Sequence, residues 1–168
     1  SITITGTAAA DVTAQVQSDD KTISDTTLDS DVTKIDINGQ TGVVMDKANA
    51  HNRTIQDVAG NGNYTIVDTV ANLASITLAG TAAADVIAEV QAADTTISDT
   101  TLDSDVTKID LKGQTGVVMN SANAHNRTIQ ATGGGDYTIV DTVANLASTK
   151  SFAGTAAASV TAQVQAAD

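Results

Sequence analysis

Two acidic segments are the first candidates for chemistry in this sequence. The string Asp-Thr-Thr-Leu-Asp-Ser-Asp occupies residues 25–31 and returns at 99–105. Calcium is held by six to eight oxygens from carboxylates and carbonyls on a flexible loop, and it is the one candidate ion, with no cofactor required. The alternative is that Asp25 caps a helix and the others are solvated. The predicted calcium ligands are Asp25, Asp29, Asp31, Asp99, Asp103 and Asp105.

The two histidines are the other residues that suggest catalysis. His51 and His125 occupy equivalent places in the repeated string Ala-Asn-Ala-His-Asn-Arg. A catalytic base needs a nucleophile in the same cleft, whereas a residue that recurs once per copy behaves as a structural position. We predict that each ring caps a turn through its nitrogens. Nothing supplies the further ligands of a His–His metal site, nucleotide-binding and hydrolase motifs are absent, and we predict no enzyme.

The composition narrows the classes of partner. The 168 residues carry a formal net charge of −12, which argues against nucleic acid and against anionic membranes. No apolar run approaches the roughly 20 residues that span a bilayer, so we expect no direct membrane insertion. The chain lacks cysteine and has only three aromatic residues. A core without rings must be built from Ile, Val, Leu and Ala in thin layers, which suits a narrow stacked body.

A long internal repeat organises the chain. Gly6, Gly80 and Gly154 lie in nearly identical strings spaced 74 residues apart, and self-similarity at a fixed long period is typical of stacked repeat proteins. Copy 1 covers residues 1–75, copy 2 covers 76–148, and a third copy begins at 149–168. The string TISDTTLDSDVTKID is identical at 22–36 and 96–110. Identity at exposed positions indicates recent tandem duplication.

Differences between the two copies indicate which positions are buried and which are exposed. Ile37 becomes Leu111, and Val67 is retained as Val140, so we predict that these positions are buried. Polar positions change freely, and we predict that they lie in water. These are Asn38 and Lys112, Asp46 and Asn120, and Lys47 and Ser121.

Short strands are the predominant predicted element. Thr-Ile pairs recur along each copy, and β-branched pairs favour strands with Ile in the core and Thr on the outer face. The segments 32–39, 42–46 and 64–68 are predicted strands, and the Asp-Thr or Gly-Thr after a strand is a predicted helix N-cap. The string AAADVTAQVQ at 8–17 fits either alternation or a helical stripe, and its alanines favour helix. The fold class is a repeat solenoid, a β-rich stack of short strands with short helical turns, of β/α-solenoid or β-helix type.

The string YTIVDTVANLAS, at 64–75 and 137–148, carries a family resemblance. It resembles the Tyr-Thr-Val-x-Asp-Thr-Ala-Ala-Asn-Leu-Ala motif of large repetitive bacterial surface proteins, which are adhesin-like or surface-layer-like. VTKIDING followed by GVVM is similar to the strand pair that accompanies that motif. The resemblance touches most of each copy and implies an extracellular or cell-surface location with a structural or adhesive role.

These observations give one leading functional hypothesis and one alternative. The leading hypothesis is a structural repeat segment of a bacterial surface or fibrous protein (adhesin, surface layer or filament), acting as a spacer or assembly unit. The alternative is a calcium-responsive adhesive module that uses the acidic loops. We expect end-to-end self-association with further repeats, together with an unidentified surface ligand. The sequence begins without methionine, so we expect a segment of a longer protein.

Overall fold

The computed structural model describes residues 11–19, 21–80, 83–93, 95–147 and 153–163. These residues are β-rich, with short strands in parallel sheets and few helices. The chain forms two compact units. Unit 1 contains Ser1–Val67 and Ile76–Val86, and unit 2 contains Asp68–Ser75 and Ile87–Asp168. The boundaries of the units therefore differ from those of the sequence copies, because a short segment of copy 1 belongs to unit 2.

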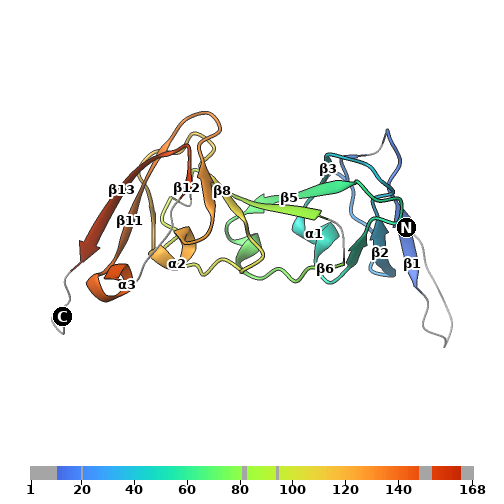
Figure 1. Ribbon diagram of the computed structural model, residues 1–168, viewed down its shortest axis with the longest axis horizontal. Coiled ribbons are helices and arrows are strands. Elements are labelled where there is room, and N and C mark those ends of the chain that lie inside the picture. The colour runs from blue at the N-terminus through green and yellow to red at the C-terminus, as the bar shows by residue number, and fades with distance from the viewer. Residues whose placement is uncertain (1–10, 20, 81–82, 94, 148–152, 164–168) are drawn as a thin grey trace. The chain divides into compact units, whose positions relative to one another are not determined.

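Unit 1 has two sets of parallel strands (Figure 1). From β2 onward, the strands along the chain alternate between these two sets. An isolated bridge from Thr22 to Val44 adds one further rung to the second set. The first set is β1 (Val12–Gln15), β2 (Val32–Asp36), β4 (Thr54–Gln56) and β6 (Ala79–Gly80), and the second is β3 (Val43–Met45), β5 (Asn63–Thr69) and β7 (Ala83–Glu89).

Unit 2 repeats this arrangement with the second copy of the sequence. The last residues of β7, Ile87–Glu89, pair in parallel with β8. Thr96 bridges to Val118 as Thr22 does to Val44. In unit 2 one set is therefore the end of β7 with β8 (Lys108–Asp110), β10 (Thr128–Gln130) and β12 (Ala153–Gly154), and the other is β9 (Val117–Met119), β11 (Asp136–Thr142) and β13 (Ala157–Gln163).

The core consists of ladders of like side chains. Ile35 pairs with Ile55 in unit 1, Ile109 pairs with Ile129 in unit 2, and all four are fully buried. The prediction that Ile of each Thr-Ile pair lies in the core is confirmed at Ile55 and Ile129. Burying one such side chain contributes about 1.5–3 kcal/mol. The second set is lined in the same way by Met45 with Ile66, and by Met119 with Ile139.

The predicted strands at 32–39, 42–46 and 64–68 are confirmed, but the predicted helix is wrong. The AAADVTAQVQ segments form strands β1, β7 and β13 where the structure describes them, while residues 8–10 lie outside the described residues. In β7 and the residue after it the buried side chains alternate, at Val86, Ala88 and Val90, and Val90 N donates to Asp110 O at 2.9 Å. Pairing with a neighbouring strand outweighs the weak helix propensity of alanine.

The helices are single turns with side-chain caps. Helix α1 (Lys47–Ala50) begins after Asp46, and α2 (Ser121–Ala124) begins after Asn120. Each cap residue accepts the backbone N–H three residues ahead, as N-caps do. The prediction that Asp46, Asn120 and Ser121 lie in water is therefore wrong, because the two caps are half-buried and Ser121 is only 2% exposed, whereas Lys112 is exposed as predicted.

Threonine hydroxyls accept backbone hydrogen bonds at the two remaining helical turns of the described residues. Helix α3 (Val143–Ala147) and the 3₁₀ turn Asn72–Ala74 follow Thr142 and Thr69, whose hydroxyls accept the N–H groups of Asn145 and Asn72. The predicted Asp-Thr cap is thus supplied by threonine at α3, while the 3₁₀ turn begins after Ala71 and Asp25 precedes no helix. Ile37 and Leu111 are fully buried as predicted, whereas Val67 and Val140 are half-buried. No helix among the described residues is long and apolar enough to cross a membrane.

Candidate functional site

A buried arginine is the most elaborate polar feature in each copy. Arg53 is 8% exposed and Arg127 is 7% exposed. The Nε, Nη1 and Nη2 groups of Arg53 together donate five hydrogen bonds of 2.8–3.2 Å, and every acceptor is a backbone carbonyl. The guanidinium has five N–H groups, so its donors are fully used. The acceptors are the carbonyl oxygens of Leu28, Asp29, Val32, Ala48 and Asn49.

Arg127 reproduces this arrangement in copy 2. Its five hydrogen bonds end on the equivalent carbonyl oxygens, at 2.7–3.2 Å. Burial lowers the pKa of Arg127, and the nearby charge of Asp103 works in the opposite direction. An arginine titrates so far above neutral pH that the group stays charged. Five carbonyl dipoles therefore replace the water that a buried cation needs. The acceptors are Leu102, Asp103, Val106, Ala122 and Asn123.

A buried asparagine on each single-turn helix completes the feature. Asn49 is fully buried. Its Nδ2 donates to the carbonyl oxygens of Ile23 and Thr26, at 2.7 and 2.6 Å, and its Oδ1 accepts Leu28 N at 2.8 Å. Asn123 makes the same three contacts with Ile97, Thr100 and Leu102 in copy 2. We call Asn49 with Arg53, and Asn123 with Arg127, the Asn–Arg clamps.

The clamps hold the acidic loops that the sequence singled out. Asn49 and Arg53 contact the backbone of 23–32, and Asn123 and Arg127 contact that of 97–106. The carbonyl groups of each loop that accept these hydrogen bonds face the clamp side chains, although the loop forms no helix or long strand. Because the contacts are to the backbone, they fix the loop's path without using its acidic side chains.

The predicted calcium ligands are placed on these loops and are not gathered into one site. Asp25 and Asp99 are exposed. Asp29 Oδ1 accepts Asp31 N at 3.2 Å, and Asp103 Oδ1 accepts Asp105 N at 3.1 Å, so these carboxylates close local turns. Among the described residues, no three histidine, aspartate or glutamate side chains form a group that could hold a metal ion. Calcium binding by these loops stays a prediction, which calorimetry would check.

The histidine prediction is confirmed at His51. Its Nδ1 accepts Thr77 N at 3.0 Å, and the next residue, Asn52, donates its N–H to Thr77 O at 3.1 Å. The ring thus caps the backbone of the segment that leads into β6. In copy 2, His125 follows α2 with the same backbone angles, as a half-buried residue.

Buried aspartates add a second polar network that ties neighbouring strands together. Asp110 Oδ1 accepts Lys112 N and Thr132 N, both at 3.0 Å, and its Oδ2 accepts Gln130 Nε2. Burial alone would raise the pKa of Asp110, but these hydrogen bonds outweigh burial and lower it. Asp36 holds the equivalent turns in copy 1, at Asn38 N and Val58 N.

One carboxylate in copy 2 is more strongly perturbed. Asp141 Oδ2 accepts both Ser121 N and Ser121 Oγ, at 3.0 and 2.7 Å, and its Oδ1 accepts Thr142 N and Asn145 Nδ2. Burial opposes ionisation, but the four hydrogen bonds dominate and bring the pKa of Asp141 to about 2. This carboxylate joins α2 to the end of β11.

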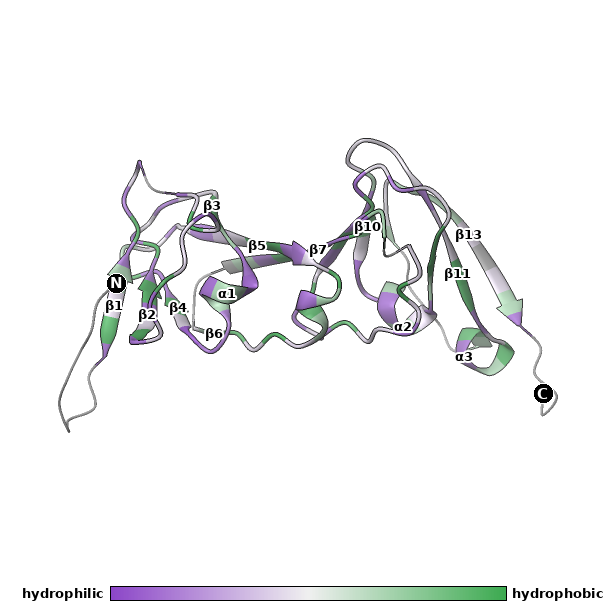
Figure 2. Cartoon of the chain, turned by 180° about the vertical axis from the view of Figure 1, so that it is seen from behind, coloured by the Kyte–Doolittle hydropathy of each residue, from purple (hydrophilic) through white to green (hydrophobic). Residues whose placement is uncertain are grey.

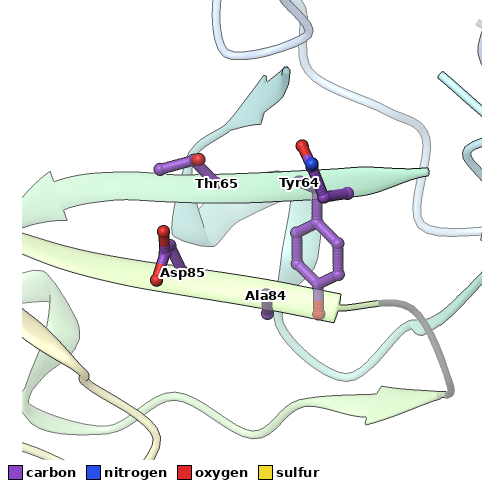
Figure 3. Close-up of a pocket in the computed structure, with 5 residues that line it drawn as sticks. Tyr64, Thr65, Ala84 and Asp85 are labelled. Carbon is purple, nitrogen blue, oxygen red and sulfur yellow. The ribbon is translucent and has the colours of Figure 1, made fainter. Parts of the chain in front are cut away.

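An open hollow in unit 1 offers little chemistry. Its volume is about 260 Å³, and it lies on β5 and β7 (Figure 3). Asn63 Oδ1 is occupied by Gly42 N at 2.8 Å, and Tyr64 is 4% exposed. In the third copy, Ser159 stands at the position that Asp85 holds in copy 2, so the Asp85 carboxylate is not repeated there. The lining residues are Asn63, Tyr64, Thr65, Ala84 and Asp85.

Comparison with known proteins gives no relative. No protein-family model, curated protein or solved structure matches this chain. The site is therefore interpreted from its own chemistry, which consists of buried polar side chains whose hydrogen bonds hold the chain's own backbone.

Sequence reasoning missed the clamp residues. The string Ala-Asn-Ala-His-Asn-Arg drew attention through its histidine, while the buried groups are the asparagine two residues before that histidine and the arginine two residues after it. The available signal was the identity of both residues in the two copies. Nothing in the spacing shows that most of their partners are backbone groups 21–26 residues earlier in the chain.

Proposed function

We propose that this chain is a structural repeat segment of a bacterial cell-surface or extracellular fibrous protein, built as a β-solenoid that acts as a spacer or assembly unit. The alternation of strands between two parallel sets supports the solenoid, because a chain that coils around one core visits each sheet once per turn. The acidic surface and the resemblance of YTIVDTVANLAS to bacterial surface repeats support the location.

The observation that carries the proposal is the duplicated Asn–Arg clamp. In each clamp a guanidinium and an amide bind backbone groups of their own copy, and the second clamp reproduces these backbone contacts of the first. Such groups stabilise a fixed shape. A molecule that serves as a spacer needs a rigid module that can be repeated, and the clamp gives each copy the same internal frame.

The test is the dependence of length on copy number. Chains with two, three and four 74-residue copies should show a maximum dimension, measured by small-angle X-ray scattering, that grows by a constant increment per copy. The free energy of unfolding should also rise with copy number, because neighbouring copies stabilise each other. A maximum dimension that fails to grow steadily would contradict the spacer proposal.

A further inference from the structure

Two identical segments of the chain differ in exposure. Thr69–Ser75 and Thr142–Ser148 both read TVANLAS. Val70 is 1% exposed and Leu73 is fully buried, whereas Val143 is 41% exposed and Leu146 is half-buried. Because the letters are the same, the difference comes from what lies against each segment. Figure 2 shows the hydrophobic residues of α3, which contains Val143 and Leu146.

In unit 2 the first of these segments is covered by the start of copy 2. Val70 N donates to Glu89 O at 3.3 Å, and Asp103 N donates to Leu73 O at 3.4 Å. Leu102, next to Asp103, is 4% exposed. We call this contact of Val70 and Leu73 with Glu89, Leu102 and Asp103 the joint. It is the interface by which one copy accepts the end of the copy before it.

The receiving surface of the joint is present a second time, in copy 1. Gln15, Leu28 and Asp29 occupy the positions of Glu89, Leu102 and Asp103. Both TVANLAS segments belong to unit 2, and Leu28 is half-buried where Leu102 is buried. The chain thus carries an apolar donor surface at Val143 and Leu146 together with an acceptor surface at Leu28.

We propose that the donor surface of one molecule docks on the acceptor surface of a second molecule and reproduces the joint between them. This inference rests on the proposed repeat function, and it identifies the surfaces used for assembly. The occupant is a second copy of this chain, because the joint already shows a TVANLAS segment seated on this kind of surface. In a longer protein, the following repeat would take the same place.

Docking in this way requires a strand exchange. Strands β1, β7 and β13 come from equivalent segments, and 12–17 and 160–165 both read VTAQVQ. Ile87–Glu89 of β7 pair with β8, and Thr13–Gln15 of β1 pair with β2 in the same register. A docked molecule would bring Thr161–Gln163 of β13 to the place held by β1 of its partner. Strand β13 therefore replaces β1 on β2.

One ion pair sets the balance between the two strands. Lys34 Nζ lies 2.7 Å from Asp11 Oδ2, and this hydrogen bond with Lys34 lowers the pKa of Asp11. Ser159 occupies the equivalent place at β13 and is instead within hydrogen-bond distance of Thr138 Oγ1, at 2.8 Å. Strand β1 thus holds β2 with a charge that β13 lacks. Asp11→Ser removes this advantage and should strengthen association several-fold.

Sedimentation velocity at rising protein concentration tests the docking surfaces. The wild-type chain should show a concentration-dependent increase in mass. Val143→Asp should raise the dissociation constant by about tenfold or more, because burying a valine is worth that factor. Val58→Asp is the matched control, since Val58 is 74% exposed in the turn after β4, and it should leave association unchanged. A monomeric wild type, or a Val143→Asp chain that associates normally, would overturn the proposal.

Cysteine pairs test the exchange, because the native chain has no cysteine. The proposed register places Thr161 of one molecule opposite Lys34 of the other. Thr161→Cys with Lys34→Cys should give disulfide-linked oligomers under oxidation, and Thr161→Cys with Thr33→Cys, one residue out of register, should give far fewer. Association without this selectivity would refute the exchange. Failure of either test would leave the increase in length per copy unaffected, so the proposed function is tested separately.

Discussion

At the scale of residues, the chain stabilises buried charge with its own backbone. Each clamp arginine is nine-tenths buried, and all of its hydrogen bonds end on carbonyl oxygens. A buried cation without such partners would cost several kcal/mol. Three of the five carbonyls that Arg53 contacts belong to the acidic loop and two to the single-turn helix α1, so the arginine also supplies donors to backbone acceptors in short, irregular segments. One side chain thus meets both requirements.

Replacing a clamp arginine should be strongly destabilising. Arg127→Met keeps most of the volume but leaves five carbonyls without their donor, and we expect the free energy of unfolding in urea to fall by about 3 kcal/mol or more. Lys112→Asn is the control, because it removes an exposed cation and introduces the residue found in copy 1. It should cost less than about 1 kcal/mol. Equal losses in the two variants would contradict the importance of the clamp.

The Asp141 carboxylate predicts a pH dependence of known sign. Its folded pKa of about 2 lies below the ordinary value of 3.8. The ionised group therefore stabilises the fold above the ordinary value, and this contribution is lost as the pH falls from 3.8 towards 2. Ser121→Ala should lower the free energy of unfolding by about 1 kcal/mol at neutral pH, and the deficit should shrink on acidification.

A second serine supplies the control for this pH dependence. Ser104 Oγ donates to Asp103 Oδ1 at 3.4 Å in an exposed position. Ser104→Ala should change the free energy of unfolding by no more than about 0.5 kcal/mol at any pH. A Ser121→Ala deficit that stayed constant from neutral to acid pH would show that Asp141 is not the titrating partner.

At the scale of elements, local preference and tertiary pairing compete. The strands that contain Thr-Ile pairs were predictable because β-branched residues favour strands and their isoleucines alternate with polar residues. The VTAQVQ segments were not, because triple alanine favours a helix when the chain is considered alone. Hydrogen bonds such as Val16 N to Asp36 O and Val90 N to Asp110 O decide the outcome, and both partners lie about 20 residues away.

Gly154 shows how closely two backbones approach at the start of a repeat. It has a φ of +141°, and a Cβ there would lie 1.8 Å from Ile129 O. Gly154→Asn should therefore separate β12 from β10 and lower the free energy of unfolding by about 2 kcal/mol or more. Gly116→Asn is the matched control, since Gly116 has a φ of +67° and open space around it. Thermal unfolding that ranks the two variants equally would contradict this account.

At the scale of the whole molecule, the sequence predicted the repeat and its β-rich character, but not its joints. The repeated glycines set the period, and Gly80 and Gly154 prove to be positions that no side chain can fill. The sequence copies predict boundaries at 75 and 148, whereas the compact units divide at Val67, Ser75 and Val86. The joint causes this shift, because a segment of copy 1 completes the fold of unit 2. The sequence period gives the length of a repeat but not the residues at which one folding unit ends and the next begins.

The difference between the boundaries of the sequence copies and those of the folding units has a genetic consequence. If a gene carries many such copies in tandem, recombination between misaligned copies inserts or deletes whole copies of 73 or 74 codons, depending on where the crossover falls. Every product then regains the same donor segment against the same acceptor surface, since no particular codon marks the edge of a folding unit. Selection can therefore change the length of such a protein through the gain or loss of copies alone, and no new interface has to evolve.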